Sequence, residues 1–332
     1  NGSGLEKVVF SSSPRRTIAG FKHYKHDPED PSSISSDRVR CIIEDHAGLL
    51  WIGTFDGGLN RFDPGTETVS SYTHDPENPA SLSSDTVYSL YQDSREILWV
   101  GTRGGLNRFD RDRGSFTRFE TSLDDPTSLS DDSVLSIHED GSGVLWFGTY
   151  SGLNKFDRDK EVFIHYNEGG GLPNDVVYGI LEDTQGYLWL STNKGLAKFD
   201  PRTEIFKSYD TRDGLQGEEF AKWAFYKSPA GEMFFGGTEG FNAFYPSEIK
   251  DNPYIPPVVI TSFTKLNEEV RFDEPISDID EIRLTHKDYV FSFEFAALEF
   301  SAPEKNRYAY KMDGLDQDWV YTDYEKRFAT YT

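Results

Sequence analysis

The chain has 332 residues and a formal net charge of −23, with 34 Lys and Arg against 57 Asp and Glu. An acidic surface of this kind repels nucleic acid and anionic lipid, so neither is an expected partner. The single cysteine excludes an internal disulfide and a multi-cysteine metal site, and no run of about 18 apolar residues could span a membrane.

The first predicted strands lie close to the N-terminus. Residues 4–8 have the pattern of a third strand in a four-stranded repeat, and residues 21–24 match its fourth strand. Four antiparallel strands joined by short turns form one blade of a β-propeller. The pattern therefore predicts that the chain opens halfway through a blade.

A repeated stretch then occurs five times. Each copy has an aromatic anchor, a small residue two positions later and, after a turn, an apolar-x-x-Phe segment. The anchors are Trp51, Trp99, Trp146, Trp189 and Phe234. A period of about 45 residues with short strands is typical of propeller blades. In the second copy we expect strands at residues 85–92, 97–102, 105–109 and 115–119.

The pattern changes after Pro256 and Pro257. Strand-forming runs then predict a separate β-sandwich with strands at residues 258–263, 290–295, 307–312 and 319–321. The acidic residues 268–281 are expected to form a loop or an irregular edge. We therefore predict two domains, a β-propeller over residues 1–250 and a C-terminally truncated sandwich over residues 251–332.

Acidic residues open four of the five predicted first strands, at Asp37, Asp85, Asp132 and Asp175. Propeller symmetry would place these carboxylates around one mouth of the channel, where they could do acid–base work or hold a cation. The favoured alternative is that an acid repeated in blade after blade bonds nearby backbone in a turn.

Other polar residues carry no convincing chemistry. His26 and His74 have no third His or Cys at ligand spacing, so they fit loop structure better than a metal site. The Glu–Asp pairs at residues 44–45, 139–140 and 182–183 precede Gly-containing turns and are expected to be solvated. We predict no catalytic set, no cofactor and no metal.

Two sets of variable positions form the predicted ligand site. The residue before the small residue of each first strand is large in every copy, and the turns between second and third strands lie on the same face of the propeller. Aromatic planes beside a cation can stack on a sugar and bond its hydroxyls. The alternative is that these side chains only pack between blades. The predicted ligand-binding residues are Arg40, Tyr88, Tyr178 and Trp223 from the strands, with Phe55, Arg103, Tyr150 and Lys194 from the turns.

The five copies resemble the two-component regulator propeller repeat, with the pattern V-x-x-I-x-E-D-x-x-G-x-L-W-x-G-T-x-x-G-L-x-x-F. The second copy departs with Glu96 in place of Gly, and the fifth departs around Phe234. The tail resembles the three-tyrosine domain that follows such propellers, at residues 291–293, 297–298, 303–304, 308–310, 314–316 and Trp319. The third copy matches the repeat at Val134, Ile137, Glu139, Asp140, Gly143, Leu145, Trp146, Gly148, Thr149, Gly152, Leu153 and Phe156.

This resemblance implies an all-β chain, with five visible blades of a seven-bladed parent propeller and a truncated immunoglobulin-like sandwich. It implies the extracytoplasmic, periplasmic sensor region of an inner-membrane signalling protein, whose anchor and histidine kinase or cyclase domain lie outside this sequence. The expected function is non-catalytic sensing of an oligosaccharide or another polar small molecule, and the full-length sensor is a candidate homodimer. The alternatives are a propeller enzyme, such as a lyase or glycosidase, and a protein-interaction scaffold.

The two ends of the repeat array test how many blades are present. The fifth copy has no evident fourth strand before Pro253, whereas residues 21–24 form a fourth strand without a first or second. If the visible blades close into a ring, these two edges should pair. If the parent has seven blades, they lie apart and stay exposed. We expect the second outcome.

Overall fold

The structure is a computed structural model, and it describes residues 2–10, 17–250, 255–266, 268–299, 303, 306–322 and 324–332. It is an all-β fold, as predicted, and divides into two compact units, Asn1–Ile249 and Lys250–Thr332. No helix among these described residues is long and apolar enough to cross a membrane. Pro253 and Glu304, used above as markers, lie outside the described residues.

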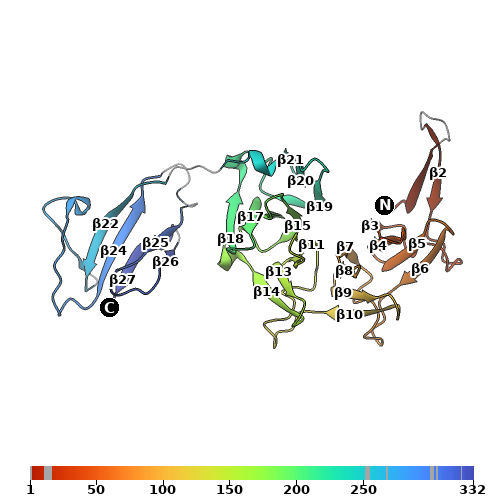
Figure 1. The fold of residues 1–332 in the computed structure, drawn as a ribbon, viewed down its shortest axis with the longest axis horizontal. Helices are drawn as coiled ribbons and strands as arrows, with labels where there is room; N and C mark the ends of the chain where they lie inside the picture. Colours follow the sequence, from red (N-terminus) through yellow and green to blue (C-terminus); the bar gives the residue numbers. More distant parts are fainter. Residues whose placement is uncertain are drawn as a thin grey trace. The chain divides into compact units, whose positions relative to one another are not determined.

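The first unit begins with a hairpin and continues as five successive sheets, here called blades 1–5 (Figure 1). The hairpin is β1 (Leu5–Phe10) and β2 (Ile18–Tyr24). Blade 1 is β3 (Val39–Glu44), β4 (Leu50–Thr54), β5 (Leu59–Asp63) and β6 (Thr68–Tyr72). Blade 2 is β7 (Val87–Gln92), β8 (Leu98–Thr102), β9 (Gly105–Asp110) and β10 (Ser115–Phe119). Blade 3 is β11 (Ser136–Glu139), β12 (Leu145–Thr149), β13 (Gly152–Asp157) and β14 (Val162–Tyr166).

Blades 4 and 5 complete the first unit. Blade 4 is β15 (Val177–Glu182), β16 (Leu188–Thr192), β17 (Leu196–Asp200) and β18 (Ile205–Tyr209). Blade 5 has three strands, β19 (Phe220–Lys227), β20 (Met233–Gly237) and β21 (Gly240–Phe244). Short 3-10 helices lie in the loops, at η1 (Glu168–Gly170), η2 (Thr211–Asp213) and η3 (Pro246–Glu248).

Blade 2 shows why these residues form a meander. Its strands pair in chain order, so Trp99 on β8 lies between Tyr91 on β7 and Arg108 on β9. The four strands predicted for this copy are confirmed, with small shifts at their ends. Glu96, in the turn between the first two strands, takes a left-handed backbone with φ of 65°. Gly occupies this turn position in the other four copies, because Gly has no Cβ and adopts a left-handed backbone at little steric cost.

The two ends of the array are not joined. Among the strands that the structure describes, β1 and β2 pair only with each other, and β21 pairs only with β20. Phe21 and Phe241 are 55% and 67% exposed on these edges. The expected separation of residues 21–24 from the last strand of blade 5 is therefore confirmed, and seven blades in the parent stay a prediction.

The tryptophan anchors form the buried centres of the blades, as predicted. Trp51, Trp99, Trp146 and Trp189 are each at most 1% exposed. Each indole Nε1 donates a hydrogen bond of 2.7–3.0 Å to the carboxylate of the Asp six residues before it, which is Asp45, Asp93, Asp140 or Asp183. A buried N–H needs such an acceptor, because an unsatisfied one costs desolvation energy.

The expectation that the Glu–Asp pairs are solvated turn acids is wrong for their aspartates. Asp45, Asp140 and Asp183 are buried. Beyond the indole, each carboxylate accepts backbone N–H groups two and four residues later and so closes the turn, as Asp45 does with Ala47 and Leu49 at 2.9 and 3.0 Å. These acids therefore act inside the fold.

The residue just before the buried aspartate completes the turn of the preceding blade. Gln92 accepts from the His46 N–H at 3.1 Å. Glu139 accepts from the Ser94 N–H at 2.6 Å and from its hydroxyl at 2.8 Å, and Glu182 accepts from the Gly141 N–H at 3.0 Å. In blade 5, Ser228 replaces the aspartate, and the residue before it is Lys227. The Lys227 Nζ donates to the Glu182 carbonyl at 2.7 Å.

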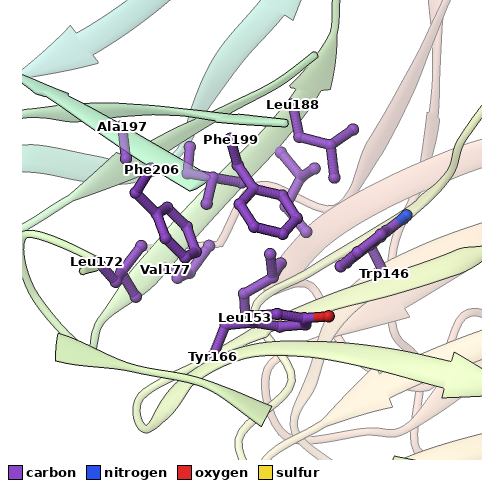
Figure 2. Packing of buried hydrophobic residues seen from close by; sticks show 11 residues of the cluster. Trp146, Leu153, Tyr166, Leu172, Val177, Leu188, Ala197, Phe199 and Phe206 are labelled. Atoms are coloured by element: carbon purple, nitrogen blue, oxygen red, sulfur yellow. The ribbon is translucent and has the colours of Figure 1, made fainter. Parts of the chain in front are cut away.

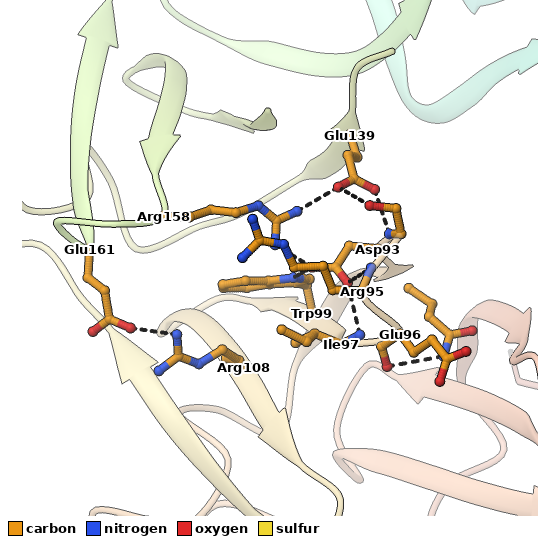
Figure 3. Close-up of polar contacts among 11 residues, drawn as sticks. Asp93, Arg95, Glu96, Ile97, Trp99, Arg108, Glu139, Arg158 and Glu161 are labelled. Carbon is orange, nitrogen blue, oxygen red and sulfur yellow. Dashed lines mark hydrogen bonds and ion pairs between the residues drawn. The ribbon is translucent and has the colours of Figure 1, made fainter. Parts of the chain in front are cut away.

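Arginines join neighbouring blades at the buried aspartates. Arg111 of blade 2 donates to Asp45 of blade 1 at 3.0 Å. Arg158 of blade 3 donates to Asp93 of blade 2 and to Glu139, both at 2.7 Å, as Figure 3 shows. The corresponding residue of blade 4 is Pro201, so this link is not repeated there.

Apolar side chains fill the space between blades. Figure 2 shows the cluster at blades 3 and 4, where Trp146, Leu153 and Tyr166 face residues from β15 to β18. The aromatic rings pack edge-on or tilted, with Trp146 and Phe199 centroids 5.4 Å apart. This packing explains the repeated Trp and Phe on the middle strands.

The second unit is described by itself. A four-stranded sheet has the order β23 (Glu268–Glu269), β22 (Val258–Lys265), β24 (Phe291–Ala297) and β27 (Phe328–Tyr331). A second sheet pairs β25 (Tyr308–Tyr310) with β26 (Val320–Thr322), and η4 (Ile276–Asp278) lies in the acidic segment. The four predicted strands are thus found, while the immunoglobulin-like topology stays a prediction.

Candidate functional site

β-Bulges position the predicted ligand residues on the first strands. In β3, Val39 pairs with Thr54 and Cys41 pairs with Gly53, the neighbour of Thr54 on β4. Arg40 therefore has no partner on β4 and is the extra residue of a bulge. The same step leaves Tyr88 extra in β7 and Tyr178 extra in β15. A bulge re-aims a side chain out of the regular alternation. The sequence pattern of one large residue at this position therefore corresponds to a repeated backbone irregularity.

The residue that follows each bulge is small because its neighbours leave no room. A Cβ built on Gly179, which follows the bulge of β15, would clash with the Phe225 ring of the next blade. Cys41 follows the bulge of β3 and faces Gly53, where a Cβ would lie 2.6 Å from the Cys41 sulfur and 2.5 Å from Val87. Burial also raises the pKa of the Cys41 thiol to about 12, so this cysteine is not a thiolate nucleophile at neutral pH.

Trp223 lies on the largest of these irregularities. The pairing of β19 with β20 jumps from Phe220 to Phe225, and Trp223 has φ of 61°. Its indole Nε1 donates to the Tyr88 carbonyl at 2.9 Å, and the two rings lie 6.0 Å apart. A large residue with positive φ is strained, and such strain persists only where surrounding contacts hold it. Blade 5 therefore reaches across to the first strand of blade 2.

Arg40 joins Trp223 to the turn of blade 1. Its guanidinium lies 4.5 Å from the Trp223 ring centre and 4.6 Å from that of Phe55. The guanidinium of the neighbouring Arg38 lies 3.8 Å from the Phe55 ring centre and donates a hydrogen bond to Asp56 at 3.1 Å. The Ser36 hydroxyl and Arg38 together hold the pKa of Asp56 below its usual value.

A second group lies beside the first. Lys222, the residue before Trp223, donates to the Tyr150 hydroxyl and lies 4.7 Å over the Tyr150 ring. It also lies 6.0 Å from the Tyr178 ring. Tyr178 is buried, which raises the pKa of its hydroxyl, and that hydroxyl donates to Asn193 at 2.6 Å. Tyr88 and Tyr150 pack against the same apolar cluster as Tyr178.

Six of the eight predicted residues are thus brought together from blades 1–5, and two are not. Arg103 and Lys194 are exposed in the turns of blades 2 and 4, and no side-chain contact joins either of them to the cluster among the described residues. Sequence reasoning missed Lys222 and Asn193, which adjoin the predicted Trp223 and Lys194. The repeat pattern indicates one variable residue for each first strand, so it does not predict that the bulge of blade 5 presents two neighbouring side chains.

The four acids at the starts of the first strands serve the loops. The carboxylates of Asp37, Asp85, Asp132 and Asp175 accept backbone N–H groups from His26, His74, Thr121 and Glu168 at 2.6–2.8 Å. His26 and His74 in turn contact carbonyls of their own loops, at 2.9 and 2.8 Å. No group of acidic, His or Cys residues that could hold a metal is found in the described residues. The favoured loop interpretation is supported for both residue types.

Comparison with known proteins addresses the repeat itself. Residues 33–56, 81–104, 128–151 and 171–194 match the family described as Two component regulator propeller. These four segments are two component regulator propeller repeats. The repeats contain every predicted ligand residue except Trp223, which lies in the fifth copy.

A curated relative is similar to part of this chain. Histidine kinase P4 of Formosa agariphila is 36% identical over 97 residues, which are 27% of this chain and 7% of the kinase. The chain thus spans a small part of that relative.

Solved structures show the fold. The extracellular domain of BT4673 from B. thetaiotaomicron, described both as a one component and as a hybrid two component system, has a TM-score of 0.53 at 18% identity, over 100% of this chain and 63% of that one. PorZ of Porphyromonas gingivalis, a surface component of the type-IX secretion system, has a TM-score of 0.54 at 14% identity, over 97% of this chain and 48% of that one. The fold of this chain is therefore similar to that of part of each of these longer chains.

Proposed function

We propose that this chain is the ligand-sensing, non-catalytic region of a signal-transduction protein. The two component regulator repeats and their similarity to Histidine kinase P4 support a sensing role. The fold shared with the extracellular domain of BT4673 supports an extracytoplasmic, periplasmic location as part of an inner-membrane protein. A histidine kinase or cyclase output domain and a membrane anchor would lie elsewhere in the full-length sensor, which is a candidate homodimer.

The observation that carries the proposal is the convergence of Arg40, Tyr88 and Trp223 from blades 1, 2 and 5. Each side chain is half-buried and stands on a bulge. Aromatic rings with a cation between them suit the faces and hydroxyls of a sugar or another polar small molecule. The fold does not require these residue types, because blade 3 carries Leu135 at the same position.

The alternative of a lyase or glycosidase has less support. Hydrolysis of a glycoside uses a pair of free carboxyl groups that flank the bond. The repeated acids at the blade mouths, such as Asp37 and Asp85, are engaged by loop backbone instead. The ligand is therefore proposed to be bound and released unchanged.

Calorimetric titration of the 332-residue chain with a panel of oligosaccharides tests the proposal. Trp223→Ala should abolish binding while the circular dichroism spectrum is preserved, because it removes the ring that joins the three blades. Tyr226→Ala is the matched control, since this aromatic residue on the same strand is 58% exposed and outside the cluster. Tyr178→Ala should also abolish binding, and Tyr178→Phe separates ring packing from the bond to Asn193.

Two results would contradict the proposal. One is the absence of any heat of binding across the panel with the intact chain. The other is unchanged affinity in Trp223→Ala, which would place a binding site elsewhere in the molecule.

A further inference from the structure

Among the described residues, two basic residues of the candidate site, Arg40 and Lys222, lack an acidic partner, although acids outnumber bases by 57 to 34 in the chain. In the part of the chain that the structure describes, Arg40 and Lys222 form no ion pair, and neither do the nearby turn residues Arg103 and Lys194. Elsewhere in the first unit, bases such as Arg108, Arg111 and Arg158 are paired with carboxylates. An unpaired cation in a strongly acidic protein leaves a local positive field that attracts an anion.

Arg40 is held in a way that leaves its donors available. Aromatic rings approach a guanidinium through its faces, whereas its N–H groups lie in the plane and point outward. The rings of Phe55 and Trp223, both within 4.6 Å, stabilise the charge without accepting its hydrogen bonds. The adjacent Arg38 is different, because its guanidinium is bound to Asp56. Arg40 is therefore suited to the bidentate recognition of a carboxylate or sulfate group.

Lys222, the residue before Trp223, supplies a second positive charge, over the rings of Tyr150 and Tyr178. Its ammonium group has three donors, and one of them is used by the Tyr150 hydroxyl. Glu219 is close enough to raise the pKa of Tyr178, but no ion pair links it to Lys222 among the described residues. The positive φ of Trp223 and its bond to Tyr88 fix the ring, and the Arg40 guanidinium lies 4.5 Å from the ring centre.

We propose that this site takes an anionic saccharide, with carboxylate or sulfate groups bound by Arg40 and Lys222 and a sugar face stacked on Trp223. The inference rests on the proposed function, since it names the class of ligand for the same site. A neutral sugar would leave both cations without a partner in a half-buried place, whereas an acidic sugar pairs them. Specificity then comes from charge, and stacking on the ring contributes affinity for many sugars.

Three probes of matched length test the proposal by calorimetry with the 332-residue chain. They are a polygalacturonate oligosaccharide, a sulfated galactan oligosaccharide and the unsulfated galactan oligosaccharide. At least one charged probe should bind about tenfold or more tightly than the neutral one, which is the scale of a charge-assisted hydrogen bond. Its affinity should fall between about 50 mM and about 300 mM NaCl, because salt screens the pairing.

Variants assign the effect to the site. Arg40→Gln and Lys222→Met should each weaken the charged probe about tenfold and leave the neutral probe unchanged. Arg95→Gln is the matched control, because Arg95 is an exposed cation in the turn between β7 and β8 of blade 2, away from the candidate site. The control should bind the charged probe normally.

The outcomes separate this inference from the function on which it rests. Binding of only the carboxylated or only the sulfated probe supports the inference and identifies the anionic group. If the neutral probe binds as tightly as the charged ones and depends on Trp223, the inference is wrong and the sensing function stands. If none of the three binds, the inference is wrong, and titration with the wider panel decides the sensing function.

Discussion

The tryptophan anchors and the bulge positions lie in the same blades, but their residues follow different rules. Trp51, Trp99, Trp146 and Trp189 are identical and each makes the same bond to a buried aspartate. The bulge residues vary, with Arg40 in blade 1 and Tyr88 and Tyr178 in blades 2 and 4, although the backbone irregularity that presents them recurs in all three. Uniform side chains thus mark what the blade needs to fold, and varied side chains on a uniform backbone mark where the molecule can specialise.

The largest expected effect comes from removing an anchor. Trp99→Ala should lower the free energy of unfolding by about 3–5 kcal/mol, since it leaves a cavity and removes one of the hydrogen bonds to the buried Asp93. Chemical denaturation followed by circular dichroism measures the change. Trp223→Ala is the comparison, and it should lower stability much less because that residue is half-buried and strained. Equal losses for the two variants would remove the distinction between the anchors and the bulge residues.

The next effect concerns the arginine link between blades. Arg158→Ala should cost about 3 kcal/mol, because it removes the one cation that pairs with the carboxylates of Asp93 and Glu139 among the described residues. Arg202→Ala is the control, since this residue pairs with Asp200 in the open turn of blade 4 and should not shift the denaturation midpoint measurably. A small effect of Arg158→Ala would mean that apolar packing alone holds the blades together.

A smaller effect should depend on pH. Burial opposes ionisation of Asp45, but hydrogen bonds from Trp51, Leu49, Arg111 and Ala47 more than compensate and hold its pKa below the usual value. A lowered folded pKa contributes stability above the unfolded value of about 4, and that contribution is lost as the pH falls through the folded pKa. Asp45→Asn should therefore cost about 2 kcal/mol at pH 7 and progressively less in acid. Urea denaturation across this range checks it, and a constant difference between variant and parent would contradict it.

The smallest effect should be a gain. Glu96 has a left-handed backbone at a position where the other copies have Gly, so Glu96→Gly should stabilise the chain by about 0.5 kcal/mol. Gly143→Ala at the equivalent turn of blade 3, with φ of 82°, should destabilise it. Thermal denaturation of both variants measures the pair, and ligand binding should stay unchanged in each. A loss of stability in Glu96→Gly would show that the glutamate side chain contributes more than its backbone costs.

Repetition explains what the sequence could predict. Five copies in register locate the strands and the Trp anchors, because each copy confirms the others. Asp45 was expected in solvent, since charged residues next to a turn are usually exposed and only the folded turn reveals the indole above it. The contact of Trp223 with Tyr88 joins residues far apart in sequence, on blades 5 and 2, and no local pattern indicates a tryptophan with positive φ.

The turns between the first two strands of blades 1–3 each bond to a residue of the following blade, so the order in which the blades are synthesised affects their folding. The acceptors for His46, Ser94 and Gly141 come from Gln92, Glu139 and Glu182, which leave the ribosome about 45 residues later. At about 5–20 residues per second, each blade waits a few seconds for the residue that finishes it. The nascent chain therefore carries, at its growing end, a blade whose turn lacks this hydrogen bond until the next blade has been made. At Lys227 the bond reverses, and the new blade donates to the old one through its own ammonium group.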